Sequence, residues 1–314
     1  MALKHSVSQT SGKALVLSAF LFAIASFLLS AWLIITKHNQ PALSIPEHHV
    51  ESALERIKRT GVVRVGYGGF PPYTIIDPSE PDPNKRVSGF VADMVYEMAS
   101  RFEPPIKVEW FNLNWATYRA DMLSKRFDFL ADATYKIIPK AIDFNISRTF
   151  SYFGIGAAIV RKDEKRFKTF NDLDRSDITI ALAQGYITTD YARKQLSKPT
   201  MKAFPVGVDA FSPMNEVLSG RADVALNDVP TVLQFARAHP DRVKALWIES
   251  PPSTVAAGLA TRREDTDLLE FLNTTIEIFQ VDGTLAGLDQ KWKSLGHFQK
   301  IELVPGAGLK DFKK

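Results

Sequence analysis

The chain has 314 residues, 45% of them hydrophobic and 24% charged, which excludes a mainly disordered, collagen-like or many-span membrane protein and leaves room for two lobes. The absence of cysteine excludes disulfides, thiolate metal sites and catalytic thiols. The formal net charge is +4, but the first 39 residues contain three lysines and no acid, so the nearly neutral remainder gives no reason to expect a nucleic-acid partner.

The N-terminal region contains a run without charge from Ala14 to Ile35, flanked by Lys13 and Lys37. At about 1.5 Å per residue a helix of this length reaches roughly 33 Å, enough to cross a bilayer core. We therefore predict a signal anchor over residues 1–39, uncleaved, with its lysine-bearing end in the cytoplasm and the body tethered in the periplasm. A cleaved signal is the alternative, because Ala23–Ala25 has the small-x-small form of a cleavage site.

The body that follows a linker at residues 40–49 alternates strands and helices. Apolar spacing predicts helices over residues 50–59, 89–101, 115–123, 189–196, 213–218 and 231–238. Apolar runs predict strands over residues 62–66, 106–110, 127–131, 157–160, 178–183 and 222–226. This alternation is typical of α/β folds with open, mostly parallel sheets and helices on both faces.

One supersecondary unit occurs twice, at Ser124–Asp132 and at Ser219–Asp228, each time as a helix end, a turn and a strand. In open α/β sheets ligands bind beyond the carboxyl ends of strands, where we expect Asp132 and Asp228. Two acids would then face one cleft from opposite lobes. The acids inside the turns are expected to be structural and to accept backbone N–H bonds: Asp128 and Asp223.

Several ordered motifs make the chain similar to the extracellular solute-binding proteins of family 3, which serve polar amino-acid ABC transporters. The resemblance covers roughly Glu51 to Gly296. The motifs are the opening at Arg56–Gly66, Phe70–Tyr73, Gly89–Met94, Ser124–Asp128, Asp143–Phe144, Gln184–Gly185, Ser219–Asp223, Asp282–Leu285 and Lys291–Trp292. Each motif alone is weak, but their order and spacing together are specific.

The resemblance implies the two-lobed periplasmic binding protein fold, with two crossover strands and hinge closure on the ligand. The crossings are expected near Gly154–Ala157 and near Val255–Gly258. Lobe one would comprise residues 50–154 and 256–300, lobe two residues 155–255, and residues 301–314 would form a flexible tail.

The resemblance also implies a set of ligand-binding residues. Aromatic walls are expected from Phe70 and Trp115, with Tyr67 and Tyr135 also enclosing the ligand. The acid that binds the ligand's amine corresponds to Asp228. Asp132 adds a second carboxylate at a position where amino-acid binders usually carry a small hydroxyl residue.

The carboxylate-binding side departs from the family pattern. The segment before Asp143–Phe144 contains no arginine, so Lys136 or Lys140 is left as the replacement, and a lysine lacks the bidentate fork of arginine. The family's Gly-Thr/Ser-Thr turn becomes Gly185–Ile187, with an apolar side chain in place of the last hydroxyl.

These features predict a monomeric binding protein that captures a small amine-bearing solute, an amino acid or a related cation, and delivers it to an ABC transporter permease. A periplasmic enzyme similar to cyclohexadienyl dehydratase, with Asp132 as the acid, and a membrane-tethered sensor on the same fold are the alternatives. No catalytic residue, cofactor or metal site is predicted for the binding protein, because the histidines lack the spacing of zinc ligands.

Overall fold

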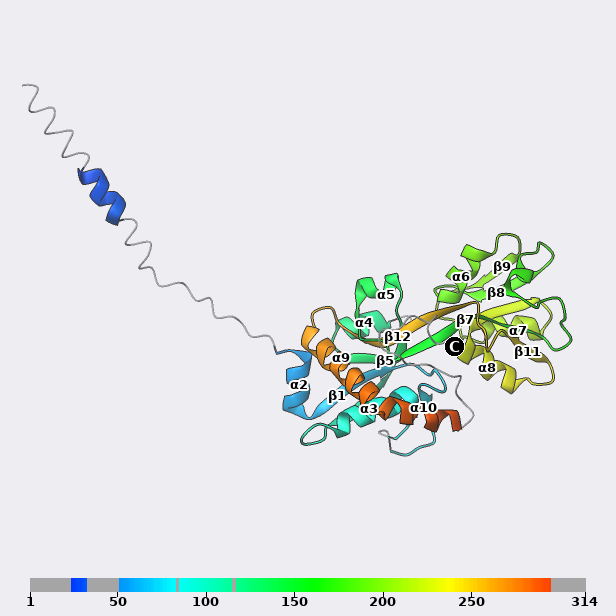
Figure 1. Cartoon of the computed structure of the whole chain (residues 1–314), viewed down its shortest axis with the longest axis horizontal. Coiled ribbons are helices and arrows are strands. Elements are labelled where there is room, and N and C mark those ends of the chain that lie inside the picture. Colours follow the sequence, from blue (N-terminus) through cyan, green and yellow to red (C-terminus); the bar gives the residue numbers. More distant parts are fainter. Residues whose placement is uncertain (1–23, 33–50, 83–84, 115–116, 295–314) are drawn as a thin grey trace, which may run out of the picture. The chain divides into compact units, whose positions relative to one another are not determined.

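The protein is described by a computed structural model over residues 24–32, 51–82, 85–114 and 117–294 (Figure 1). The chain divides into two compact units, Met1–Val50 and Glu51–Lys314. In the first unit, residues 24–32 form a helix that exposes large apolar side chains such as Phe27 and Trp32. No helix within the described ranges has the length and apolar character needed to span a membrane. Most of the predicted anchor, the linker at 40–49 and the tail at 301–314 lie outside those ranges, so these remain predictions.

The second unit, which we call the body, contains the following helices and strands in chain order. They are α2 (Ala53–Thr60), β1 (Val62–Tyr67), β2 (Ile75–Ile76), β3 (Val87–Ser88), α3 (Phe90–Ser100), β4 (Lys107–Asn112), α4 (Tyr118–Leu123), β5 (Phe129–Tyr135), α5 (Ile138–Asp143), β6 (Asn145–Ile146), β7 (Ser151–Arg161), η1 (Phe170–Leu173), β8 (Thr179–Ala183), α6 (Ile187–Gln195), β9 (Thr200–Phe204), α7 (Ser212–Leu218), β10 (Val224–Asp228), α8 (Val229–Ala238), β11 (Val243–Leu246), β12 (Ser253–Thr261), α9 (Thr266–Val281) and α10 (Thr284–Ser294).

The main sheet has the strand order β4-β1-β5-β12-β7-β10-β8-β9, with β6 beside β12 and β11 beside β7. The strands β4, β1 and β5 run parallel, as do β10, β8 and β9. Pairing is antiparallel where β12 and β7 join these two groups. The fold is therefore a two-lobed α/β architecture, in which lobe one carries β4-β1-β5 and lobe two carries β10-β8-β9 (Figure 1).

Two long strands connect the lobes and change partner along their length. Strand β7 pairs with β12 from Ser151 to Ile155 and with β10 from Ile155 onward. Strand β12 pairs with β7 up to Ala257 and with β5 from that residue onward. Both points of exchange, Ile155 and Ala257, lie within the stretches where the crossings are expected.

The buried side chains form separate cores for the two lobes. The clusters of lobe one contain residues from the ranges 53–155 and 255–292. The clusters of lobe two contain residues from the range 157–248. Burial of these apolar side chains is the dominant favourable contribution to folding, so each lobe has its own source of stability.

The repeated turn has the same structural role in both lobes, as the sequence predicts. The carboxylate of Asp128 accepts a hydrogen bond from the backbone N–H of Arg64 at 2.7 Å, which ties the turn to β1. The carboxylate of Asp223 accepts one from the N–H of Thr179 at 2.9 Å, which ties the second turn to β8. Each turn acid thus fixes the register between its own strand and the neighbouring parallel strand.

The loop that carries Phe70 is held by the start of α3. Two first-turn N–H groups of α3, those of Phe90 and Val91, donate to the carbonyls of Pro72 and Tyr73. Gly89 precedes them with φ 121°, and a Cβ there would collide with the carbonyl of Tyr73. Glycine is therefore needed for this close approach, which explains the Gly-Phe motif.

Two of the family-like motifs meet in lobe one. The carboxylate of Asp93, on α3, accepts hydrogen bonds from the indole Nε1 of Trp292 at 2.8 Å and from Lys291 at 2.6 Å. These bonds dock α10 onto α3. The two motifs, far apart in sequence, are thus parts of one helix–helix contact.

Candidate functional site

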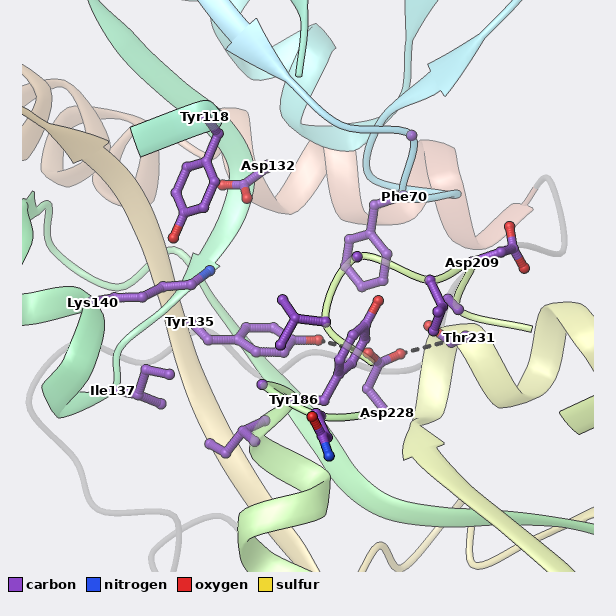
Figure 2. A pocket seen from close by; sticks show the side chains of 18 residues that line it. Phe70, Tyr118, Asp132, Tyr135, Ile137, Lys140, Tyr186, Asp209, Asp228 and Thr231 are labelled. Carbon is purple, nitrogen blue, oxygen red and sulfur yellow. Dashed lines mark hydrogen bonds between the residues drawn. The ribbon is translucent and has the colours of Figure 1, made fainter. Parts of the chain in front are cut away.

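A cavity of 410 Å³ lies in the body and receives residues from both lobes (Figure 2). Its volume is in the range of sites that enclose small molecules. Lobe one contributes Gly69, Phe70, Tyr118, Asp132, Tyr135, Ile137 and Lys140, and lobe two contributes Gln184, Gly185, Tyr186, Ile187, Val206, Gly207, Val208, Asp209, Ala210, Asp228 and Thr231.

Asp228 is the most constrained acid of the cavity. It ends β10 and caps the N-terminus of α8, where its carboxylate accepts from the Thr231 N–H at 2.9 Å. The other carboxylate oxygen accepts from the Tyr135 hydroxyl at 3.1 Å. The side chain is buried, and this burial raises its pKa above the ordinary aspartate value. Within the described part of the chain no basic side chain pairs with it, so a cationic ligand would supply the missing charge.

Asp132 also lines the cavity, but from inside a strand. The sequence places it at the end of its strand, and this prediction is wrong by three residues because β5 runs on to Tyr135, where it pairs with β12. The carboxylate of Asp132 is buried and accepts a hydrogen bond from the Thr134 hydroxyl. The pKa of the Tyr118 phenol is raised, first by burial and then by the nearby charge of Asp132.

Three aromatic side chains approach the Asp228 carboxylate from different elements. Phe70 comes from the loop after β1, Tyr135 from the end of β5, and Tyr186 from the residue that precedes α6. Figure 2 shows their rings directed into the space around Asp228. Burial and the charge of Asp228 raise the pKa of both tyrosines. The sequence names Phe70 and Tyr135 for this wall but does not single out Tyr186.

The basic side chain at the cavity is Lys140, on α5, and no arginine is among the described lining residues. Figure 2 shows its amine directed toward the side of the cavity where Tyr118 and Asp132 lie. Lys136, the other sequence candidate, does not line the cavity, and burial lowers its pKa. Of the two lysines, the structure therefore places Lys140 where it can meet a ligand.

The N-terminus of α6 faces the cavity through Gly185, Tyr186 and Ile187. Gly185 has φ 80°, a conformation that glycine adopts without strain. The helix has no side-chain cap, and the N–H groups of Ile187 and Thr188 have no acceptor among the described residues. Such free N–H groups favour a carboxylate or another anion. Gly185 and Ile187 therefore lie where the sequence predicts them.

One of the predicted ligand residues, Tyr67, lies away from the cavity, and another, Trp115, is not among the described residues. Tyr67 is buried in the core of lobe one, where its ring packs edge-on against Trp110 at 5.6 Å, so the structure does not support a ligand contact. Tyr67 is the last residue of β1 rather than part of the following loop, which explains the difference. Trp115 lies outside the described residues, and its predicted role remains a prediction.

Several lining residues are missing from the sequence analysis. The loop between β9 and α7, residues 206–210, contributes five consecutive residues, including Asp209 on the rim. This loop has no apolar period and no motif, so only the fold brings it to the cavity. Thr231 follows Asp228 by three residues, and the N-cap spacing could have identified it.

The chemistry of the cavity favours a cation. Its described lining contains three aspartates, one lysine and four aromatic rings. Aromatic faces and unpaired carboxylates both attract positive charge, and the low dielectric of a buried site strengthens that attraction. Over the same part of the chain, no group of three or more acidic or histidine side chains is arranged to hold a metal ion.

Comparison with known proteins gives consistent results. The sequence matches the family described as bacterial extracellular solute-binding proteins, family 3, over residues 63–295. The chain is 24% identical over 248 residues to the Probable amino-acid ABC transporter-binding protein of Haemophilus influenzae, covering 78% of this chain and 89% of that protein. It is 23% identical over 251 residues to the L-cystine-binding protein TcyJ of Escherichia coli, covering 80% and 89%.

The fold is also similar to a solved structure, the ancestral amino acid-binding protein AncCDT-1, described as a precursor of cyclohexadienyl dehydratase. The TM-score is 0.64 and the identity 24%, with 77% of this chain and 99% of that chain covered. At this level of identity the likeness shows the fold.

Proposed function

Because the chain belongs to family 3 of the bacterial extracellular solute-binding proteins, we propose that it captures a small amine-bearing solute outside the cytoplasm. The solute would be an amino acid or a related cation, enclosed between the two lobes and delivered to an ABC transporter permease. The relatives named as amino-acid and cystine-binding proteins support this class of ligand.

One observation carries the proposal: Asp228 is buried in a cavity that both lobes line, and no described basic side chain pairs with it. A buried carboxylate without a positively charged partner destabilises a protein. Such a group is retained where a ligand supplies the opposite charge. A ligand ammonium at this position would neutralise the charge.

Asp228 and Tyr135 also explain how binding would couple to closure. Tyr135 belongs to lobe one and Asp228 to lobe two, and the hydrogen bond between them joins the two lobes at the cavity. A ligand that contacts both residues would hold the lobes together, which is the state that a permease would receive.

A thermal-shift screen of the full-length protein against amino acids, amines, sugars and prephenate tests the proposal. A solute with Kd of about 1 μM, added at about 100 μM, should stabilise the protein by roughly 2.7 kcal/mol and raise Tm by several degrees. Asp228→Asn should remove the shift. Asp209→Asn, the same change on the exposed rim of the cavity, should keep it. Shifts with neutral sugars alone would contradict the proposal.

A dehydratase on this fold is the alternative, with Asp132 as the acid that protonates a leaving hydroxyl. We propose binding rather than catalysis, because a prephenate-like dianion would be repelled by the buried carboxylates of Asp132 and Asp228. Incubation with prephenate, followed by mass spectrometry, distinguishes the two. A dehydrated, decarboxylated product would establish the enzyme.

A further inference from the structure

The surroundings of Asp228 resemble a cage more than an open salt-bridge site. The rings of Phe70, Tyr135 and Tyr186 come from three separate elements, and Figure 2 shows them around the carboxylate. A cation above such faces is attracted by the ring quadrupoles, and the attraction grows when water is excluded. The buried carboxylate adds a full negative charge at the same point.

The cage is defined by Phe70, Tyr135 and Tyr186, and neighbouring rings hold the first two in place from outside. Phe153, itself buried, packs against the ring of Phe70 at 5.7 Å and against that of Tyr135 at 5.3 Å. Phe70 also stacks on Tyr73 at 5.2 Å with an interplanar angle of 19°. Within the described chain the three cage rings make no ring contact with one another, and all three line the same cavity.

The hydrogen-bonding capacity of the cage is partly used. One oxygen of Asp228 already accepts from the Thr231 N–H, and the other accepts from the Tyr135 hydroxyl. The carboxylate has about four lone-pair positions, so about two remain for the three N–H donors of a primary ammonium, and at least one donor would need another acceptor in this buried site. Each methyl group removes one N–H donor, so a trimethylammonium needs no acceptor, and its charge interacts directly with the carboxylate and the rings.

We propose that this cage binds a methylated ammonium group, at best a trimethylammonium. The inference rests on the proposed function and specifies its ligand class. The remaining part of the ligand would extend toward Tyr118, Asp132 and Lys140, which line the cavity away from the cage (Figure 2).

A methylation series tests the inference directly. The full-length protein is titrated calorimetrically with ethanolamine, N-methylethanolamine, N,N-dimethylethanolamine and choline. Affinity should rise with each methyl group, and choline should bind at least about tenfold more tightly than ethanolamine. The uncharged carbon isostere of choline, 3,3-dimethylbutan-1-ol, should bind at least about tenfold more weakly than choline, since it lacks the charge.

The outcomes separate this inference from the proposed function. If ethanolamine binds as tightly as choline, or if only primary amines such as lysine shift Tm, the cage assignment is wrong while amine binding stands. If neither this series nor any amine or amino acid binds, both proposals fail.

Substitutions at Tyr186 show whether its ring or its hydroxyl is needed to bind choline. Tyr186→Leu removes the ring and should weaken choline at least about tenfold, while Tyr186→Phe keeps the ring and should bind within about threefold of the unmodified protein. Tyr96→Leu is the matched control on α3, away from the described lining of the cavity, and choline affinity should be retained. Equal losses in Tyr186→Phe and Tyr186→Leu would assign the effect to the hydroxyl and overturn the inference. Melting curves confirm that each variant is folded.

Discussion

Asp132 and Asp228 end the two copies of the same helix–turn–strand unit, yet their surroundings differ. After β10 a helix begins at once, so Asp228 caps α8 and is fixed by the Thr231 N–H and the Tyr135 hydroxyl. After Asp132 the strand continues, and a single neighbouring hydroxyl, that of Thr134, holds the carboxylate. The repeated unit thus brings an acid to the cavity from each lobe, while the element that follows decides how firmly each acid is oriented.

The turn acids of the two copies, Asp128 and Asp223, have the same structural role but differ in burial. Asp128 is fully buried and pairs with Arg56 and Arg64. The side chain of Asp223 is 24% exposed and pairs with Arg166, whose side chain is 34% exposed. Burial removes solvent screening, so the first copy should matter more for stability.

The largest expected effect is therefore on folding, at the buried turn acid. Asp128→Ala should lower the free energy of unfolding by about 3 kcal/mol, because it leaves two arginines and a backbone N–H without their acceptor. Asp223→Ala should cost about 1 kcal/mol, because its ion pair is screened by solvent. Urea unfolding of both variants measures the difference, and equal losses would show that burial does not separate the two turns.

The second effect is on binding, at the cavity acids. Asp228→Asn should weaken a cationic ligand about 100-fold, which corresponds to roughly 2.7 kcal/mol, because the charge is lost at a buried and oriented position. Asp132→Asn should weaken the same ligand less than about tenfold, since its carboxylate is oriented by one hydroxyl. Calorimetric titration of both variants with the same ligand makes the test. A larger loss at Asp132 would reverse the assignment of the main cation site.

The smallest effect is on the pH dependence of stability at Asp228. Its pKa is raised in the folded state, so its charge costs stability at neutral pH, and that cost disappears as the pH falls through the folded pKa. Asp228→Asn should therefore be more stable than the unmodified protein at pH 7. The advantage should vanish near the ordinary pKa of 3.8.

The same titration should weaken cation binding on acidification, because the protonated acid carries no charge. Burial and the charge of Asp228 raise the pKa values of Tyr73, Tyr135 and Tyr186, so these tyrosines stay neutral over this range. Melting curves and titrations from pH 4 to pH 8 record both effects. If the stability advantage of Asp228→Asn grew at low pH, the pKa of Asp228 could not be raised in the folded protein.

Local patterns in the sequence were sufficient for much of the fold. The apolar spacing predicts α3, β1, β8 and α8 to within a few residues, and the repeated unit predicts the role of both turn acids. The start of β7 is missed because Gly154 and Gly156 interrupt the apolar pattern on which a strand prediction depends. The sequence analysis makes no prediction for the long helix α9.

The candidate site is less completely predictable, because it depends on contacts between lobes. Asp228 is identified because it follows the carboxyl end of a predicted strand and corresponds to the amine-binding acid of the similar family. Tyr67 does not line the cavity because its side chain packs against Trp110 in the core of lobe one. Loop 206–210 lines the cavity only because the tertiary fold of lobe two brings it there. The hydrogen bond between Tyr135 and Asp228 joins residues from different lobes, and no local pattern encodes such a pair.

A crystal structure of the protein with its tightest-binding amine tests the central claim most directly. The account predicts that the positively charged nitrogen lies within about 4 Å of an Asp228 carboxylate oxygen, between the rings of Phe70 and Tyr186. A complex in which a neutral or anionic part of the ligand faces Asp228, with its nitrogen elsewhere in the cavity, would contradict it.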